Sequence, residues 1–172
     1  SMLPVTYGYL LMLGAEGLKH VTEMAILNAN YLASSFEKLG FKILFKGKQG
    51  RVGHEMIWDC SAFNKEYGIS ELDIAKRLMD FGFHAPTLSF PVHGTLMVEP
   101  TESEPKEELD RFIEALKTIR EEMCEVAEGK ADKTDNVLKN APHTHKVLTA
   151  DEWTHTYPRS KAAYPLPWVA EN

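Results

Sequence analysis

The chain has 172 residues, 44% of them hydrophobic, and a formal net charge of −6. This length fits one domain with a single packed core, and no apolar run approaches the roughly 20 residues that a membrane helix needs. The acidic balance, with lysine and arginine dispersed among acids, argues against a nucleic-acid partner.

Cysteine and histidine usage predicts no metal centre and no disulfide framework. Cys60 and Cys124 lie far apart in the sequence and lack CxxC spacing, so we expect free thiols. His143 and His145 are the only close histidine pair, and no acid or cysteine beside them completes a ligand set.

The N-terminal third predicts a long helix with an unusual start. Residues 3–13 are apolar and aromatic, and Gly14 interrupts them. Because exposed apolar segments usually mark interfaces, we expect residues 1–17 to be the cut end of an inter-domain helix, with packing on the domain as the alternative. Apolar side chains at three- and four-residue spacing then predict a helix over residues 18–39.

Two strands should follow as an antiparallel pair, at residues 41–45 and 52–58, joined by a glycine-bounded turn. On a strand, His54 and Glu55 would point to opposite faces and would not form an acid–base pair. His54 then either faces a cleft or forms a hydrogen bond at a strand end.

The next helix is predicted over residues 69–82, with Ser70 as its N-cap and Gly82 at its end. A run rich in proline follows from His84 to Glu102, and it should be stiff and extended, with its best strand at residues 95–98. Glu99 and Glu102 are expected to hold backbone donors.

The last long helix is predicted from Ser103 to Glu128, with its early glutamates near the positive end of the helix dipole. Residues 129–172 contain four prolines and several aromatic side chains, so we expect an ordered, extended arm wrapped over a surface. The whole pattern predicts an α+β fold: a two-layer domain over residues 18–128, with a small, mainly antiparallel sheet and helices on one face.

Several motifs in this chain resemble the C-terminal region of the glycine-cleavage-system P-protein, the pyridoxal-phosphate (PLP) glycine decarboxylase. They are Gly53-His-Glu55, His84-Ala-Pro-Thr87, Phe90-Pro-Val92, Gly94 to Ser103 and Ala163-Tyr-Pro-Leu-Pro167. The resemblance implies the small domain of a fold-type-I PLP enzyme, which closes over an active site built mostly by a large domain and a second subunit.

The implied reaction is the decarboxylation of glycine with PLP as electron sink, followed by transfer of the aminomethyl group to the lipoyl arm of the H-protein. The PLP-binding lysine of such enzymes lies upstream of anything in this chain, so no cofactor-binding residue is assigned and the chain alone is expected to be inactive. The implied partners are the large domain, a second protomer, the H-protein and glycine. The implied location is the cytoplasm of a bacterium, or the mitochondrion of a eukaryote.

Five residues are predicted to line the substrate side of the cleft. His54, His84 and His93 would handle protons near neutral pH, and the hydroxyls of Thr87 and Ser89 would donate hydrogen bonds to a glycine carboxylate. The alternative for the two hydroxyl residues is turn chemistry in a proline-rich segment.

Two other functions remain open. The chain would suit a free-standing α+β interaction or regulatory module, since small domains of this kind serve many functions. It would also suit the small domain of another fold-type-I enzyme such as an aminotransferase, in which an arginine holds the substrate carboxylate. The candidates for that role are Arg51, Arg77, Arg111 and Arg120.

Overall fold

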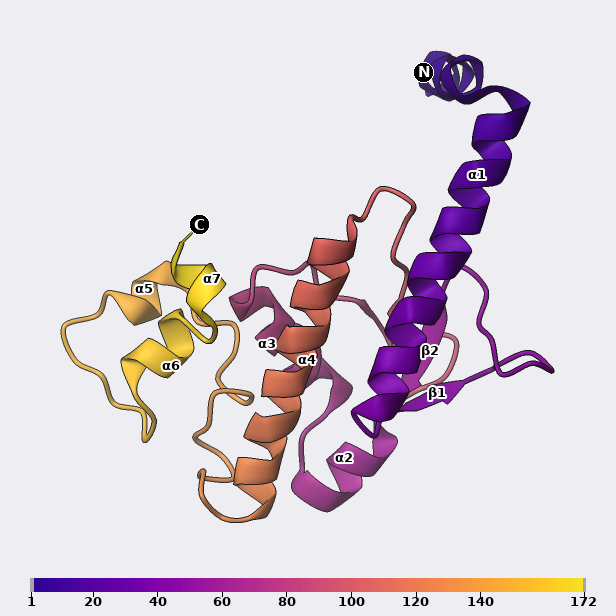
Figure 1. The fold of residues 1–172 in the computed structure, drawn as a ribbon. Coiled ribbons are helices and arrows are strands. Elements are labelled where there is room, and N and C mark those ends of the chain that lie inside the picture. Colours follow the sequence, from indigo (N-terminus) through magenta and orange to yellow (C-terminus); the bar gives the residue numbers. More distant parts are fainter. Residues whose placement is uncertain (1, 172) are drawn as a thin grey trace.

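A computed structural model of the chain describes residues 2–171 (Figure 1). Its elements, in chain order, are α1 (Leu3–Lys38), β1 (Lys42–Leu44), β2 (Met56–Asp59), α2 (Ser61–Tyr67), α3 (Glu71–Asp80), β3 (Thr87–Leu88), β4 (Thr95–Val98), α4 (Lys106–Ala127), α5 (His145–Leu148), α6 (Arg159–Ala163) and α7 (Pro167–Ala170). No helix within residues 2–171 combines the length and hydropathy needed to span a bilayer.

The four strands form one antiparallel sheet in the order β1-β2-β4-β3. Ile43, Trp58 and Leu96 are register partners across three strands, and all three are buried. Because side chains alternate between the faces of a strand, this row belongs to the core face. The predicted α+β class with a small antiparallel sheet is confirmed.

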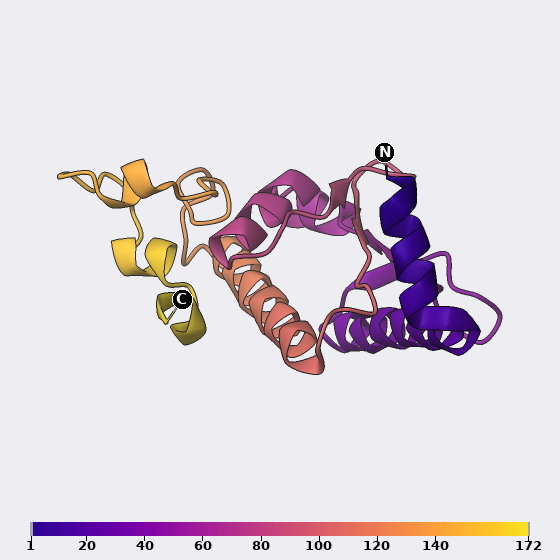
Figure 2. The same cartoon turned by 90° about the horizontal axis from the view of Figure 1, so that it is seen from above.

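Helices α1 and α4 pack beside each other and supply much of the core, as the two views in Figures 1 and 2 show. Phe36 of α1 lies edge-on to Trp58 of β2, with ring centroids 5.7 Å apart. Leu116 and Ile119 of α4 are completely buried in the same cluster. The buried faces of both helices therefore belong to one core.

Helix α1 bends at Gly14, whose φ of 60° and ψ of −171° are not helical. Glycine tolerates a positive φ because it lacks a Cβ. The turns before the bend stand clear of the rest of the domain (Figure 1), and they expose most of their apolar side chains, including Leu3 (76%) and Leu11 (65%). One contact ties this part to the domain, a 2.9 Å hydrogen bond from Tyr9 Oη to Glu102 Oε1.

Local signals predicted α3 correctly. Ser70 Oγ accepts a hydrogen bond from the Asp73 amide, and the Asp73 carboxylate accepts one from the Ser70 amide, which completes a capping box. The helix is followed by Gly82, which has a φ of 81°.

Three sequence predictions need correction. The second strand begins at Met56 rather than Val52. The last long helix begins at Lys106, with Pro105 at its N-cap, rather than at Ser103. Helix α2 was missed, because its seven residues bury only Phe63 and so carry no clear helical stripe.

The C-terminal segment contains the short helices α5, α6 and α7, which were not predicted. Val137 and Leu138 are buried within the domain core, so this segment belongs to the packed domain. It lies beside α3 and α4 in both overall views (Figures 1 and 2).

Candidate functional site

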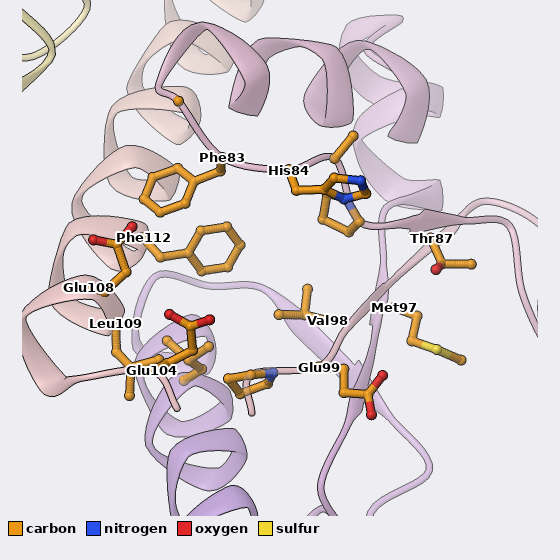
Figure 3. Close-up of a pocket in the computed structure, with 15 residues that line it drawn as sticks. Phe83, His84, Thr87, Met97, Val98, Glu99, Glu104, Glu108, Leu109 and Phe112 are labelled. Atoms are coloured by element: carbon orange, nitrogen blue, oxygen red, sulfur yellow. The ribbon is translucent and has the colours of Figure 1, made fainter. Parts of the chain in front are cut away.

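A cleft of about 460 Å³ opens between α1, the segment after α3, the end of β4 and the beginning of α4. Its walls combine apolar and acidic side chains (Figure 3). The lining residues are Leu32, Gly82, Phe83, His84, Ala85, Pro86, Thr87, Met97, Val98, Glu99, Pro100, Glu104, Glu108, Leu109 and Phe112.

Three local features hold these walls in place. Thr87 pairs with Met97 across β3 and β4, which fixes the start of the β3 wall. Phe83 and Phe112 meet edge to face with ring centroids 5.0 Å apart. Asn28 of α1 is buried, and its Nδ2 donates to the carbonyl of Thr101 at 2.9 Å, which anchors the loop between β4 and α4.

The cleft is acidic. Glu99, Glu104 and Glu108 line it, and its lining contains His84 but neither lysine nor arginine. Glu108 accepts a 2.7 Å hydrogen bond from Arg111 Nη1. An apolar floor with carboxylates at the edge suits a ligand with an apolar body and a positively charged group, and His84 adds an imidazole to the lining.

Of the five predicted cleft residues, His84 and Thr87 line the cleft, and both are exposed. Glu104, just before α4, and Glu108, in its first turn, were not predicted to line it. Their charge alone indicated only a favourable helix dipole, and no local signal distinguishes a glutamate that faces a cleft from one that faces solvent. Asn28 lies within the helix predicted over residues 18–39, and nothing in its local sequence indicated a contact with the loop between β4 and α4.

His54 is not on a strand, which overturns the prediction that it and Glu55 point apart. Its Nε2 lies 3.9 Å from Glu55 Oε2 and 3.7 Å from Glu99 Oε1. Because β2 begins only at Met56, alternation between faces does not apply to the two residues before it. Glu99 is part of the cleft lining, so this cluster lies at the cleft edge.

The hydroxyl of Ser89 is used within the β3–β4 connection. Its Oγ donates to Glu71 Oε1 at 2.8 Å and accepts from the Gly94 amide at 3.2 Å. Ser89 has a φ of 50°. The contact with Gly94 lies within the connection, as its alternative role in turn chemistry would require, and the contact with Glu71 joins the connection to α3. His93 is exposed in the same connection, and neither residue is among those that line the cleft.

The expected role of Glu99 and Glu102 as acceptors for backbone donors is wrong for both. Glu99 pairs with His54, and Glu102 accepts from the Tyr9 hydroxyl. Both side chains therefore connect segments that are distant in sequence. Their position just before a predicted helix gave no indication of these contacts.

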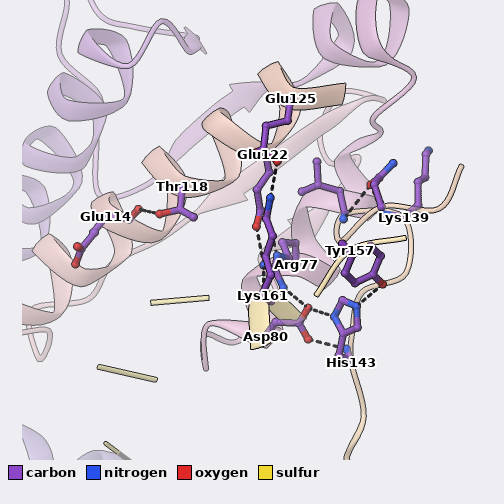
Figure 4. A network of polar contacts seen from close by, with 12 residues as sticks. Arg77, Asp80, Glu114, Thr118, Glu122, Glu125, Lys139, His143, Tyr157 and Lys161 are labelled. Atoms are coloured by element: carbon purple, nitrogen blue, oxygen red, sulfur yellow. Dashed lines mark hydrogen bonds and ion pairs between the residues drawn. The ribbon is translucent and has the colours of Figure 1, made fainter. Parts of the chain in front are cut away.

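A second polar cluster, away from the cleft, is buried (Figure 4). Arg77 is completely buried, and its Nε and Nη2 donate to the two carboxylate oxygens of Glu122 at 3.0 and 2.6 Å. Its Nη1 donates to Asp80 at 3.0 Å. Burial alone would lower the pKa of Arg77, but the carboxylates of Glu122 and Asp80 outweigh it and raise that pKa.

This cluster also binds the C-terminal segment. The carboxylate of Asp80 accepts from the His143 amide and lies 2.7 Å from His143 Nδ1, and His143 Nε2 lies 2.8 Å from the Tyr157 hydroxyl. Arg77 is thus committed to structure, which removes it as a substrate-carboxylate arginine. Arg111 and Arg120 likewise contact Glu108 and Cys124.

The fold and the site define the class of protein: an α+β domain with an apolar cleft edged by carboxylates. The part of α1 before Gly14 is apolar, exposed and separate from the core of this domain. Comparison with known sequences then identifies the family. The model of the family described as "Glycine dehydrogenase, C-terminal domain" matches residues 21–143. The chain belongs to this family.

Curated relatives extend the similarity over the whole chain. The "Glycine dehydrogenase (decarboxylating)" of Bacteroides fragilis (strain ATCC 25285) is 58% identical over 172 residues, which are 100% of this chain and 18% of the relative. The protein with the same name from Flavobacterium johnsoniae is 61% identical over 168 residues, 98% of this chain and 17% of its own. That of Nostoc punctiforme is 54% identical over 171 residues, which are 99% of this chain and 17% of the relative. The chain thus spans less than a fifth of the length of these relatives.

Proposed function

We propose that this domain serves as the C-terminal part of an enzyme that decarboxylates glycine with PLP and passes the aminomethyl group to the lipoyl arm of the H-protein. The observation that carries this proposal is the 58% identity, over all 172 residues, to a glycine dehydrogenase (decarboxylating). Similarity at this level across a whole chain supports a shared role for the domain.

The cleft does not fit PLP itself. Its lining has three carboxylates and no lysine or arginine, whereas PLP needs a lysine for its aldehyde and donors or cations for its phosphate. The proposal therefore places the cofactor in the rest of the enzyme and gives this domain a supporting role at the edge of the active site.

Within that role, His84 and Thr87 are the residues that we propose to face substrate. They line one wall of the cleft, and both side chains are exposed. His84 would hold or deliver a proton, and Thr87 would donate a hydrogen bond to a carboxylate. His54 lies at the cleft edge next to Glu99, and its role as a third such residue remains a prediction, as do those of Ser89 and His93.

The exposed apolar part of α1 supports a protein partner. Val5, Leu10 and Leu11 expose between 45% and 67% of their surface, and such patches usually mark an interface. We propose the large domain of the enzyme and a second protomer as its partners, in the cytoplasm of a bacterium or the mitochondrion of a eukaryote. This surface also weighs against a free-standing module.

Two measurements test the proposal. The chain is mixed with PLP and glycine, and it should give neither a reducible imine absorbance nor release of labelled CO₂. In a full-length enzyme that carries this domain, His84→Ala should reduce glycine-dependent CO₂ exchange with lipoylated H-protein by about 100-fold, as expected for loss of a proton-transfer residue.

The matched control is His20→Ala, on the exposed side of α1 and outside the cleft lining. It should leave the exchange unchanged. Decarboxylation by the chain alone would contradict the placement of the cofactor, and an unchanged rate in His84→Ala would contradict the role of that histidine.

A further inference from the structure

We propose that His54, Glu55 and Glu99 form a binding site for a divalent transition-metal ion such as Zn²⁺. One ligand atom from each residue lies within 4.8 Å of the other two. The site shares Glu99 with the cleft lining, but binding of the ion requires neither glycine nor PLP and is measurable without them.

The sheet forces the two carboxylates together. Strands β2 and β4 are antiparallel neighbours, and their last register pair is Met56 with Val98. Glu55 and Glu99 are the next residues on the two chains, just beyond this pair, and their carboxylates lie within 4.8 Å of each other. Like charges held this close repel each other, and a cation would relieve the repulsion.

No cation of the chain fills this role. Within residues 2–171, neither Glu55 nor Glu99 has a lysine or arginine nitrogen within 4.0 Å, and their ion-pair partner is His54. The contrast with Glu122 is direct, since that carboxylate receives two hydrogen bonds from Arg77. The two cleft-edge glutamates therefore lack the compensation that the chain supplies to its buried acids.

The distances suit one small ion. Ligands held at about 2.0–2.2 Å from a tetrahedral Zn²⁺ lie roughly 3.4 Å apart. His54 Nε2 is already 3.7 Å from Glu99 Oε1 and 3.9 Å from Glu55 Oε2, so both distances need to shrink by only a few tenths of an ångström. The two carboxylates lie within 4.8 Å of each other and would approach each other on binding. The side chains are partly exposed and are therefore able to make this adjustment.

The donor set indicates the class of ion. One imidazole nitrogen with two carboxylate oxygens suits Zn²⁺ and neighbouring first-row ions, whereas Ca²⁺ and Mg²⁺ prefer oxygen ligands alone. Three protein ligands leave at least one coordination position for water or for a ligand from another molecule. The sequence predicted no metal site because His54 and Glu99 are 45 residues apart and meet only through the register of the sheet.

The test uses the untagged 172-residue chain after treatment with EDTA. Zn²⁺ is titrated by calorimetry, and the imidazole signals of the histidines are followed in ¹H–¹⁵N spectra. We expect one strong site per chain and a shift of the His54 signal, assigned by its absence in His54→Ala. His54→Ala and Glu99→Gln should each weaken binding by at least about 10-fold.

His20→Ala and Glu66→Gln are the matched controls, because both residues are exposed and distant from the cluster in sequence, and neither change should alter the affinity. Circular dichroism verifies that each variant is folded. The proposal is overturned if the wild-type chain binds Zn²⁺ no more tightly than His54→Ala does, or if the histidine signal that shifts belongs to another residue.

Discussion

Two groups of charged side chains in this domain differ in how they are neutralised. Around Arg77, every carboxylate is buried and paired: Glu122 and Asp80 both accept from the guanidinium, and Asp80 also contacts His143. At the cleft edge, Glu55 and Glu99 are partly exposed, and in the described part of the chain the ion-pair partner of both is His54. The first group joins α3, α4 and the C-terminal segment, while the second holds charge in a form available to a ligand.

The largest expected effect comes from removing the centre of the buried group. Arg77→Met should lower the free energy of unfolding by about 3–5 kcal/mol, because two carboxylates would stay buried without their cation. Urea denaturation followed by circular dichroism measures this change. Arg51→Met is the control, since Arg51 is exposed, and it should change stability by less than about 0.5 kcal/mol. Equal effects of the two changes would show that the buried group contributes no more than a surface charge.

The second prediction concerns the attachment of the C-terminal segment. His143→Ala removes the ring that lies 2.7 Å from Asp80 Oδ2 and 2.8 Å from the Tyr157 hydroxyl. Loss of these contacts should cost about 2 kcal/mol, because one of them is to a charged group. Cleavage by trypsin near Lys146 should become faster, as mass spectrometry would show. The control is His145→Ala, because His145 is exposed in the short helix α5. This change should leave the cleavage rate unchanged.

The third prediction concerns the wall of the cleft. Asn28→Ala removes the donor to the carbonyls of Thr101 and Glu104, and the loop between β4 and α4 loses its anchor on α1. We expect a loss of about 1–2 kcal/mol and faster amide exchange in residues 99–105. Asn64→Ala, at an exposed position of α2, should show neither change. Unaltered exchange in Asn28→Ala would mean that other contacts hold the loop.

Features that depend on neighbouring residues could be predicted from the sequence, and features that depend on strand pairing or helix packing could not. Ser70 as an N-cap and the glycine after α3 are local signals, and they identified the helix, whose capping box with Asp73 the structure adds. Strand β3 has two residues, and it is a strand because it pairs with Met97 and Leu96. The residues next to it in the sequence therefore do not indicate a strand. The meeting of Glu55 with Glu99 depends in the same way on strand register, and the pairing of Arg77 with Glu122 depends on the packing of α3 against α4.

The candidate site, too, was predictable where local sequence carried the signal and unpredictable where tertiary contacts decide. The resemblance of short motifs indicated the family, and two residues named from the proline-rich run, His84 and Thr87, line the cleft, while their role toward a substrate stays a prediction. The run did not separate them from Ser89, whose hydroxyl is held by Glu71, a residue of the preceding helix. A hydroxyl offered to a ligand and one used inside a turn have the same local sequence, and tertiary contacts alone distinguish them.

The smallest expected effect is at the cleft edge. In metal-free buffer at low ionic strength, Glu99→Gln should raise the free energy of unfolding, by no more than about 0.5 kcal/mol, because it removes one of two facing negative charges that are partly exposed. Raising the salt to 1 M shortens the screening length to about 3 Å, so the difference from the wild-type chain should disappear. A loss of stability in Glu99→Gln, unchanged by salt, would mean that Glu99 acts as a structural acceptor like Glu122. The distinction between a charge held for structure and a charge held for a ligand would then fail at this position.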